Sequence, residues 1–293
     1  MLNAPKKVND TMSAPKIPFF PLDGAIPKVL HQIYFQPGDC EAVLPKILAT
    51  NVGLLRQQNP EWAHRLYGLA DMETFIAGHY GQAMLSRFQR ISLDYGAAKA
   101  DLFRYLTLYK MGGIYLDIKS RFVKPIDTYL QDDDQFLLSQ WRNGPGQPHA
   151  GWGLHAELVD VPGGEFQQWH IIAAPGHPFL RAVIERVVEA IDSYRPQRGN
   201  VGWTGVLNTT GPIVYTRAIT PLIGSAPCRL VADETELGLE YSVLERSAHQ
   251  RVFSHHYTRN TSPVINRPWP GSWLDQAFIK ARNAKHSIWK REG

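Results

Sequence analysis

The chain has 293 residues, 44% of them hydrophobic and 20% charged, which is enough to bury the core of one large or two small domains. The formal net charge is +4 and the basic residues are dispersed, so no nucleic-acid partner is predicted. This mild excess suits anionic ligands such as nucleotide diphosphates, or loose association with an anionic membrane surface. The two cysteines, Cys40 and Cys228, exclude a disulfide framework and a thiolate metal site.

No apolar run is long enough to cross a bilayer, and charged residues and prolines interrupt the N-terminus where a signal core would lie. We therefore expect a cytoplasmic protein, whose contact with a membrane would be limited to peripheral association with its inner face. Residues 1–25 are rich in proline and lysine, which predicts a flexible leader, and one ordered domain is expected over 26–293.

The predicted elements alternate between strands and helices. In chain order we expect a strand over 29–35, a helix over 43–58, a strand over 62–67, helices over 71–78, 82–92 and 97–111, strands over 114–117, 135–141, 155–161 and 169–174, helices over 178–194 and 212–222, strands over 228–232 and 252–257, and a helix over 273–284. This order predicts an α/β fold with a mixed, mostly parallel sheet and helices on both faces.

The helix over 97–111 carries two kinds of pattern. Four apolar side chains between Leu102 and Tyr109 recur at helical spacing and predict one buried stripe. Asp101 and Arg104 lie three residues apart and share a different face, where they form either an ordinary surface ion pair or part of a ligand site. The second alternative gains weight because the helix leads directly towards a strand that ends on a carboxylate.

That strand follows a glycine pair and ends at Asp117. Strand alternation predicts that Tyr115, Asp117 and Lys119 share one face. A carboxylate at the carboxyl end of a strand in an open α/β sheet lies where such sheets bind ligands. Asp117 can ligate a hard divalent cation, whereas Lys119 can neutralise a diphosphate as a point charge or simply point into solvent.

Four segments carry a family resemblance when they are taken in order. They are Ile26-Pro27-Lys28-Val29-Leu30-His31-Gln32-Ile33, Asn59-Pro60-Glu61-Trp62, Lys99-Ala100-Asp101-Leu102-Phe103-Arg104-Tyr105 and Gly112-Gly113-Ile114-Tyr115-Leu116-Asp117. In them the chain resembles glycosyltransferase family 32, the DXD-type sugar transferases that include α-mannosyltransferases and bacterial polysaccharide glycosyltransferases. The resemblance covers roughly residues 26–275 and is most specific over 97–127.

The resemblance implies a GT-A-like single domain that transfers a sugar from a UDP- or GDP-sugar, with retention at the anomeric carbon, to a glycan or lipid-linked saccharide. From the chemistry of the residues themselves we expect catalytic roles for Asp117, Lys119 and Arg104, with the two cations offsetting the charge that grows on the departing diphosphate. The residues implied to bind the donor are Asp101, Arg104, Tyr115, Asp117, His31, Tyr34 and Trp273. A role in bacterial surface polysaccharide synthesis follows by analogy with the family.

The sequence departs from the family pattern at Lys119, where the second acid, the main metal ligand of the family, is expected. Dependence on Mn²⁺ or Mg²⁺ is therefore open: either the ammonium group replaces the cation, or Asp117 binds a metal with help from elsewhere. His255-His256 provides one candidate helper, with His256 the tentative ligand and a packed strand histidine as the alternative.

Trp141, Trp152 and His155 lie in a glycine-rich stretch that either stacks on an acceptor or forms ordinary surface connections. Two rival functions also stay open. The first is a non-catalytic protein that binds a nucleotide-sugar or a glycan and has lost catalytic activity because the second acid is missing. The second is a nucleotide-sugar hydrolase, which would release the nucleotide without an acceptor.

Overall fold

The computed structural model describes residues 17–36, 43–196, 201–244, 260–267 and 270–289. A six-stranded sheet runs through the molecule in the order β2-β1-β3-β6-β5-β7. Its strands are β1 (Val29–Ile33), β2 (Ala63–Tyr67), β3 (Gly113–Leu116), β5 (Phe136–Leu138), β6 (His170–Ala173) and β7 (Arg229–Leu230). A separate two-stranded ribbon pairs β4 (Arg121–Phe122) with β8 (Leu239–Glu240).

The sheet is mixed. Strand β1 pairs in parallel with both β2 and β3, and β5 pairs in parallel with β7, whereas β6 runs antiparallel between β3 and β5. The predicted fold class, a mixed and mostly parallel sheet flanked by helices, is therefore confirmed.

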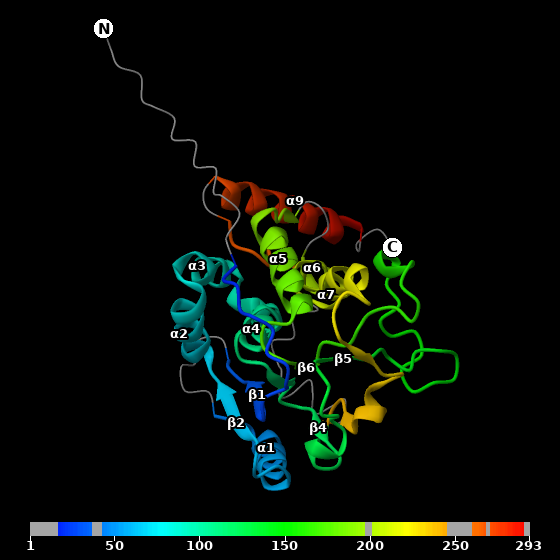
Figure 1. Ribbon diagram of the computed structural model, residues 1–293. Coiled ribbons are helices and arrows are strands. Elements are labelled where there is room, and N and C mark those ends of the chain that lie inside the picture. The colour runs from blue at the N-terminus through cyan, green and yellow to red at the C-terminus, as the bar shows by residue number, and fades with distance from the viewer. Residues whose placement is uncertain (1–16, 37–42, 197–200, 245–259, 268–269, 290–293) are drawn as a thin grey trace.

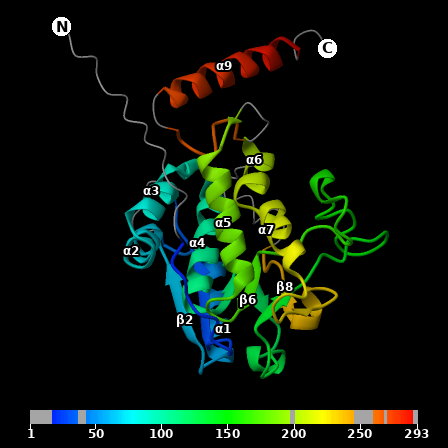
Figure 2. The same ribbon diagram turned by 45° about the horizontal axis from the view of Figure 1, so that its top comes forward.

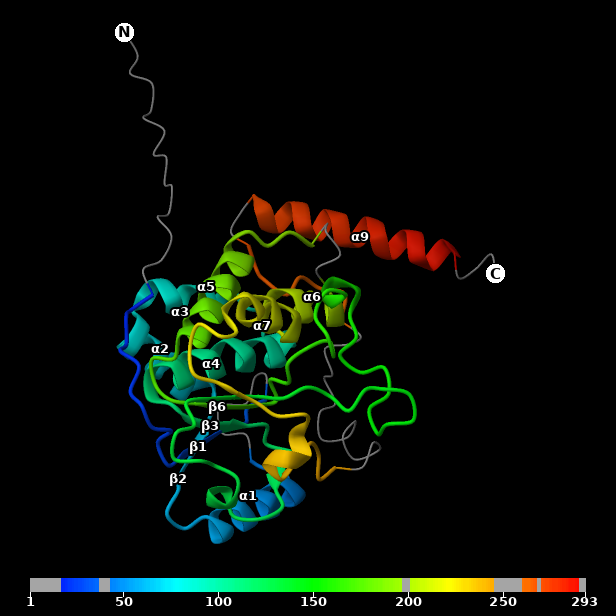
Figure 3. The same ribbon diagram turned by 45° about the vertical axis from the view of Figure 1, so that its right-hand side comes forward.

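Alternate side chains of the strands feed two hydrophobic cores on opposite faces of the sheet. On β3, Tyr115 belongs to the larger core, while Ile114 and Leu116 belong to the smaller one. The larger core lies under α2 (Leu69–Tyr80), α3 (Gln82–Arg90), α4 (Gly96–Met111) and α5 (Pro178–Asp192). Helix α1 (Lys46–Gln58) lies at the other face, as Figure 3 shows.

Three more helices complete the larger side: α6 (Gly202–Thr209), α7 (Pro212–Ile219) and α9 (Gly271–Trp289). Helix α9 lies on the far side of α5 and α6 from the sheet (Figures 1 and 2). Short 3₁₀ turns are η1 (Leu93–Tyr95), η2 (Ile126–Thr128), η3 (Ala156–Leu158), η5 (Thr220–Leu222) and η6 (Glu234–Leu237). No helix in the described part of the chain has the length and apolar character needed to span a membrane.

The packed chain begins earlier than predicted. Ile17 is buried in the larger core, and Phe20 packs edge-on against Tyr80, so the expectation of a flexible leader is wrong for residues 17–25. Residues 1–16 lie outside the described residues. The prediction of a single domain beyond this segment stays a prediction.

Most predicted elements are confirmed to within a few residues, but one predicted strand is wrong, and helix α6 and the two-residue strands β4 and β8 were not predicted. The strand expected over 155–161 is wrong, because η3 occupies its centre. Helix α6 was not predicted at all, since its eight residues, GWTGVLNT, contain two glycines and two threonines and show little helical periodicity. The strand expected over 252–257 lies outside the described residues.

Candidate functional site

A glycine pair fixes where the candidate site begins. Helix α4 ends at Met111 and is capped by Gly112, and Gly112 and Gly113 both have positive φ angles, 63° and 98°. A Cβ atom on Gly113 would collide with the carbonyl oxygen of Val29 on β1. The backbones of α4, β1 and β3 therefore approach one another closely, and only glycine permits this approach.

His31 belongs to this junction and not to a base pocket. Its side chain is 1% exposed, with Nε2 3.0 Å from the carbonyl oxygen of Gly112 and Nδ1 2.9 Å from the Tyr67 hydroxyl. Burial lowers the pKa of His31 to about 4, so the ring is neutral. The predicted donor contact of His31 is thus corrected: its side chain ties the glycine pair to the sheet.

Asp101 and Arg104 form a buried ion pair on α4, not a surface pair. The two side chains are 3% and 6% exposed, and Arg104 Nη2 lies 2.8 Å from Asp101 Oδ1. Thr210 donates a hydrogen bond of 2.9 Å to the other Asp101 oxygen. Arg104 also donates to the carbonyl oxygen of Gln168 at 2.6 Å, and its guanidinium carbon lies 4.4 Å from the ring centre of Tyr115.

Burial changes the protonation of this pair. It raises the pKa of Asp101 to about 6, because desolvation outweighs the Arg104 charge and the Thr210 hydrogen bond. Burial alone would lower the pKa of Arg104, but the neighbouring acidic groups raise it, so the guanidinium stays charged. The site therefore holds a permanent cation beside a carboxyl group that titrates close to neutrality.

Tyr115, Asp117 and Lys119 come together as predicted, but by a different geometry. Strand β3 ends at Leu116, and the Ser120 amide donates to the Asp117 carbonyl oxygen at 2.8 Å, which closes a tight turn. The Tyr115 hydroxyl donates to Asp117 Oδ1 at 2.8 Å, and Lys119 Nζ lies 3.9 Å from Asp117 Oδ2. The turn, and not strand alternation, directs Lys119 towards the carboxylate.

Tyr241 is the partner of Lys119 that the sequence did not indicate. Lys119 Nζ donates to the Tyr241 hydroxyl at 2.8 Å and lies 4.1 Å from the centre of its ring. The same segment accepts a hydrogen bond from Ser120 Oγ, at 2.6 Å on the Tyr241 carbonyl oxygen. Since Tyr241 lies 122 residues from Lys119 and follows a two-residue strand, no local pattern marks it.

These side chains line one open cleft of about 800 Å³. Asp101, Arg104, Tyr115, Asp117 and Lys119 all contribute to it. Tyr34 and Phe35, which follow β1, also line this cleft, and their predicted contact with the nucleotide base stays a prediction.

Among the described residues, Trp273 is a predicted donor contact that, like His31, does not line this cleft. Trp273 lies on α9, is 63% exposed and does not line the cleft, so its predicted role as a donor cap is not supported by its position. His256, the tentative metal ligand, and its neighbour His255 lie outside the described residues.

The described residues around Asp117 do not by themselves fit a divalent cation. Its carboxylate is 24% exposed and faces two cations: Arg104 Nη1 at 3.7 Å and Lys119 Nζ at 3.9 Å. Within the ranges that the structure describes, no group of three or more His, Cys, Asp or Glu side chains is placed to hold a metal ion. Positive side chains occupy the surroundings in which further oxygen ligands would be needed.

Comparisons with known proteins agree with the sequence resemblance. Residues 45–137 match the model of a family described as "Glycosyltransferase sugar-binding region containing DXD motif", which confirms the resemblance to glycosyltransferase family 32. This range contains α4, β3 and the charged cluster of Asp101, Arg104, Asp117 and Lys119.

Two of the curated relatives are initiation-specific mannosyltransferases. An initiation-specific α-1,6-mannosyltransferase of Candida albicans is 27% identical in an alignment that covers 68% of this chain and 54% of that protein. The protein of the same name in Schizosaccharomyces pombe is 27% identical in an alignment that covers 68% of this chain and 49% of that protein. The chain thus spans about half the length of these relatives. A UDP-bound glycosyltransferase domain from the YGT toxin is similar with a TM-score of 0.49 and 9% identity, over 72% of this chain and 80% of that one.

Proposed function

We propose that the chain is a retaining glycosyltransferase that moves a sugar from a nucleotide-diphosphate sugar to a glycan or glycolipid acceptor. The observation that carries this proposal is the buried cluster of Arg104 and Lys119 around Asp117 in an open cleft. The family match over 45–137 and the mannosyltransferase relatives support the same reaction class.

The cluster suits a step in which negative charge grows on a leaving group. As the bond between the anomeric carbon and the diphosphate breaks, Arg104 and Lys119 offset the charge that develops on the phosphate oxygens. The acceptor oxygen forms its bond on the same face of the sugar, and its proton passes to the departing phosphate. No separate protein nucleophile is required for this route.

The two carboxylates have different roles in this proposal. Asp101 is buried and engaged by Arg104 and Thr210, so it holds the guanidinium in place. Asp117 is more exposed and is fixed by the Tyr115 hydroxyl, so it can accept hydrogen bonds from hydroxyl groups of the donor. The donor nucleotide extends towards Tyr34 and Phe35.

The test is to incubate the protein with a panel of UDP- and GDP-sugars, with and without Mn²⁺, and to follow nucleotide release and sugar transfer. We expect transfer that requires an acceptor and persists without metal. Release without an acceptor would favour a hydrolase. Thermal stabilisation by UDP or GDP without turnover would favour a non-catalytic binder.

Two narrower expectations complete the proposal. The acceptor context is bacterial surface polysaccharide synthesis, and the protein works in the cytoplasm at the inner face of the membrane. Their support is the family resemblance and the mild positive charge. Fractionation of the native cells, with assay of the soluble and membrane fractions, tests the location.

A further inference from the structure

One wall of the cleft is built from aromatic side chains that begin at Lys119. The ring of Tyr241 lies under the Lys119 ammonium group. Trp141 packs edge-on against Tyr241 with ring centres 5.2 Å apart, and Trp152 does the same at 6.0 Å. The wall therefore continues outward from the charged cluster without a break.

Two tryptophans of the cleft remain open to solvent. Trp152 and Trp203 are each 47% exposed, although both line the cleft. Trp203 lies near the start of α6, and its ring is a neighbour of the His155 ring. An exposed indole in a concave site leaves a large, flat apolar surface available to a ligand.

A hydrogen-bonded pair lies between these two tryptophans. His155 Nε2 is 2.7 Å from Glu165 Oε2, and Glu165 Oε1 accepts a 2.7 Å hydrogen bond from Trp141 Nε1. Glu165 is 8% exposed, so both of its oxygens are used inside the wall. The His155 ring is 5.8 Å from Trp203, and the carboxylate fixes its orientation at the cleft surface.

A glycine makes this arrangement possible. Gly153 has a φ of 70°, and a Cβ atom there would lie 2.6 Å from Glu165 Cγ and 2.8 Å from Trp141 Cδ1. The backbone of the loop therefore packs directly on the Glu165–Trp141 pair. It carries Trp152 on one side of the glycine and His155 on the other.

We propose that Trp152, Trp203 and the His155–Glu165 pair form the acceptor subsite, and that it takes a pyranose ring. A pyranose presents C–H groups on one face, which suit an exposed indole, and hydroxyl groups at its edge, which suit an oriented imidazole. A lipid tail would offer no polar partner to the His155 ring at the cleft surface. This inference rests on the proposed function, because it assigns one substrate of that reaction to one wall of the same cleft.

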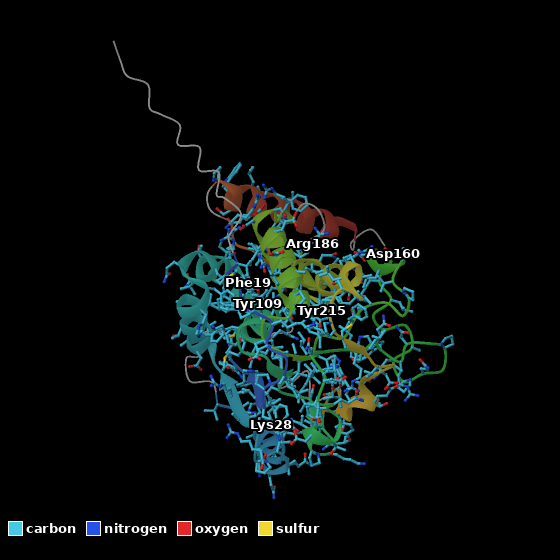
Figure 4. The ribbon with its side chains drawn as sticks, in the orientation of Figure 1. Phe19, Lys28, Tyr109, Asp160, Arg186 and Tyr215 are labelled. Carbon is cyan, nitrogen blue, oxygen red and sulfur yellow. The ribbon has the colours of Figure 1, made fainter. Side chains whose placement is uncertain are left out.

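The variants that test it are Trp203→Ala, Trp152→Ala and His155→Gln, with Phe19→Ala as the matched control. Phe19, labelled in Figure 4, is 72% exposed and does not line the cleft. With α-1,6-mannobiose as acceptor, each cleft variant should raise the KM for the acceptor by about tenfold. Thermal stabilisation by the nucleotide should stay at the wild-type value, which also shows that the variants fold. The control should change neither quantity.

If the wild type transfers sugar and the acceptor KM is unchanged in all three cleft variants, the inference is overturned. A second measurement needs no turnover: saturation-transfer NMR should show mannobiose contacts with the wild type that are lost in Trp203→Ala. Contacts with dodecyl phosphate in place of mannobiose would assign the wall to a lipid and overturn the pyranose subsite. If the protein contacts mannobiose but transfers sugar from no nucleotide sugar, the pyranose subsite stands and the proposed function is refuted.

Discussion

Replacing Lys119 by methionine removes one charge from the site and leaves most of its shape. Methionine has a similar length and can still lie on the Tyr241 ring, which the Lys119 side chain covers. Asp117 keeps its hydrogen bond from Tyr115 and its contact with Arg104. The substitution therefore tests the electrostatic role of the ammonium group separately from packing.

The size of the effect follows from the distances in the site. Lys119 Nζ lies 3.9 Å from the nearest Asp117 oxygen, and a phosphate oxygen at the same distance would interact by about 4 kcal/mol at an effective dielectric constant of about 20. Desolvation of the ammonium group offsets part of this, so the net loss should be about 2–4 kcal/mol. At about 1.4 kcal/mol for each factor of ten, kcat/KM should fall by roughly 30- to 1,000-fold.

The assay is steady-state sugar transfer with the best donor of the panel, without added metal. The control is Lys28→Met: Lys28, labelled in Figure 4, makes an exposed 2.7 Å ion pair with Asp127 and does not line the cleft. We expect the control to retain wild-type activity. A Lys119→Met enzyme with unchanged kcat/KM, or a wild type that EDTA inactivates and Mn²⁺ restores, would refute the reasoning.

Three further predictions concern the same site. Lys119→Asp should restore an acidic pair and make transfer depend on added Mn²⁺, measured by titration of the metal after EDTA; activity that ignores Mn²⁺ would contradict this. Because the folded-state pKa of Asp101 is about 6, above its ordinary value of 3.8, its contribution to stability should decrease as pH rises from 4 to 6. The rate of sugar transfer should instead decrease as pH falls below 6, because protonation of Asp101 releases Arg104. Asp101→Asn should remove the pH dependence of the melting temperature and that of the transfer rate. In denaturant unfolding, Gly113→Ala should lower the free energy of unfolding by about 3 kcal/mol or more. The control Gly146→Ala should lower it by about 1 kcal/mol, because Gly146 also has a positive φ, 76°, but has open space around it.

Periodicity predicted the long elements well and the short ones poorly. Helices α4 and α5 have 16 and 15 residues, so each contains several turns of its apolar pattern. Strands β4 and β8 have two residues each, too few for any alternation to be visible. Their pairing nevertheless brings the Tyr241 segment to the turn at Lys119.

The predicted stripe on α4 shows where amphipathic reasoning fails. All four apolar side chains of the stripe are buried, but so are Asp101 and Arg104 on another face. Helix α4 packs against α2, α5, α6 and β3, and so lacks a broad solvent face. Charged residues three apart on such a helix must be paired internally, and this burial distinguishes Asp101 and Arg104 from a surface pair.

Charge balance explains why Lys119 is compatible with the rest of the site. In the family pattern, two acids and one divalent cation sum to a formal charge of zero. Asp117 and Lys119 also sum to zero. Replacing the second acid by lysine raises the charge of the site by two units, and this gain equals the charge of the divalent cation that the acid would have bound. Asp101 and Arg104 form a second neutral pair beside them. A diphosphate that enters this site meets two fixed cations whose counter-charges, Asp101 and Asp117, are held by Thr210 and Tyr115. Preorganisation by these hydrogen bonds lets the ammonium group act without the ligand rearrangement that a metal would need.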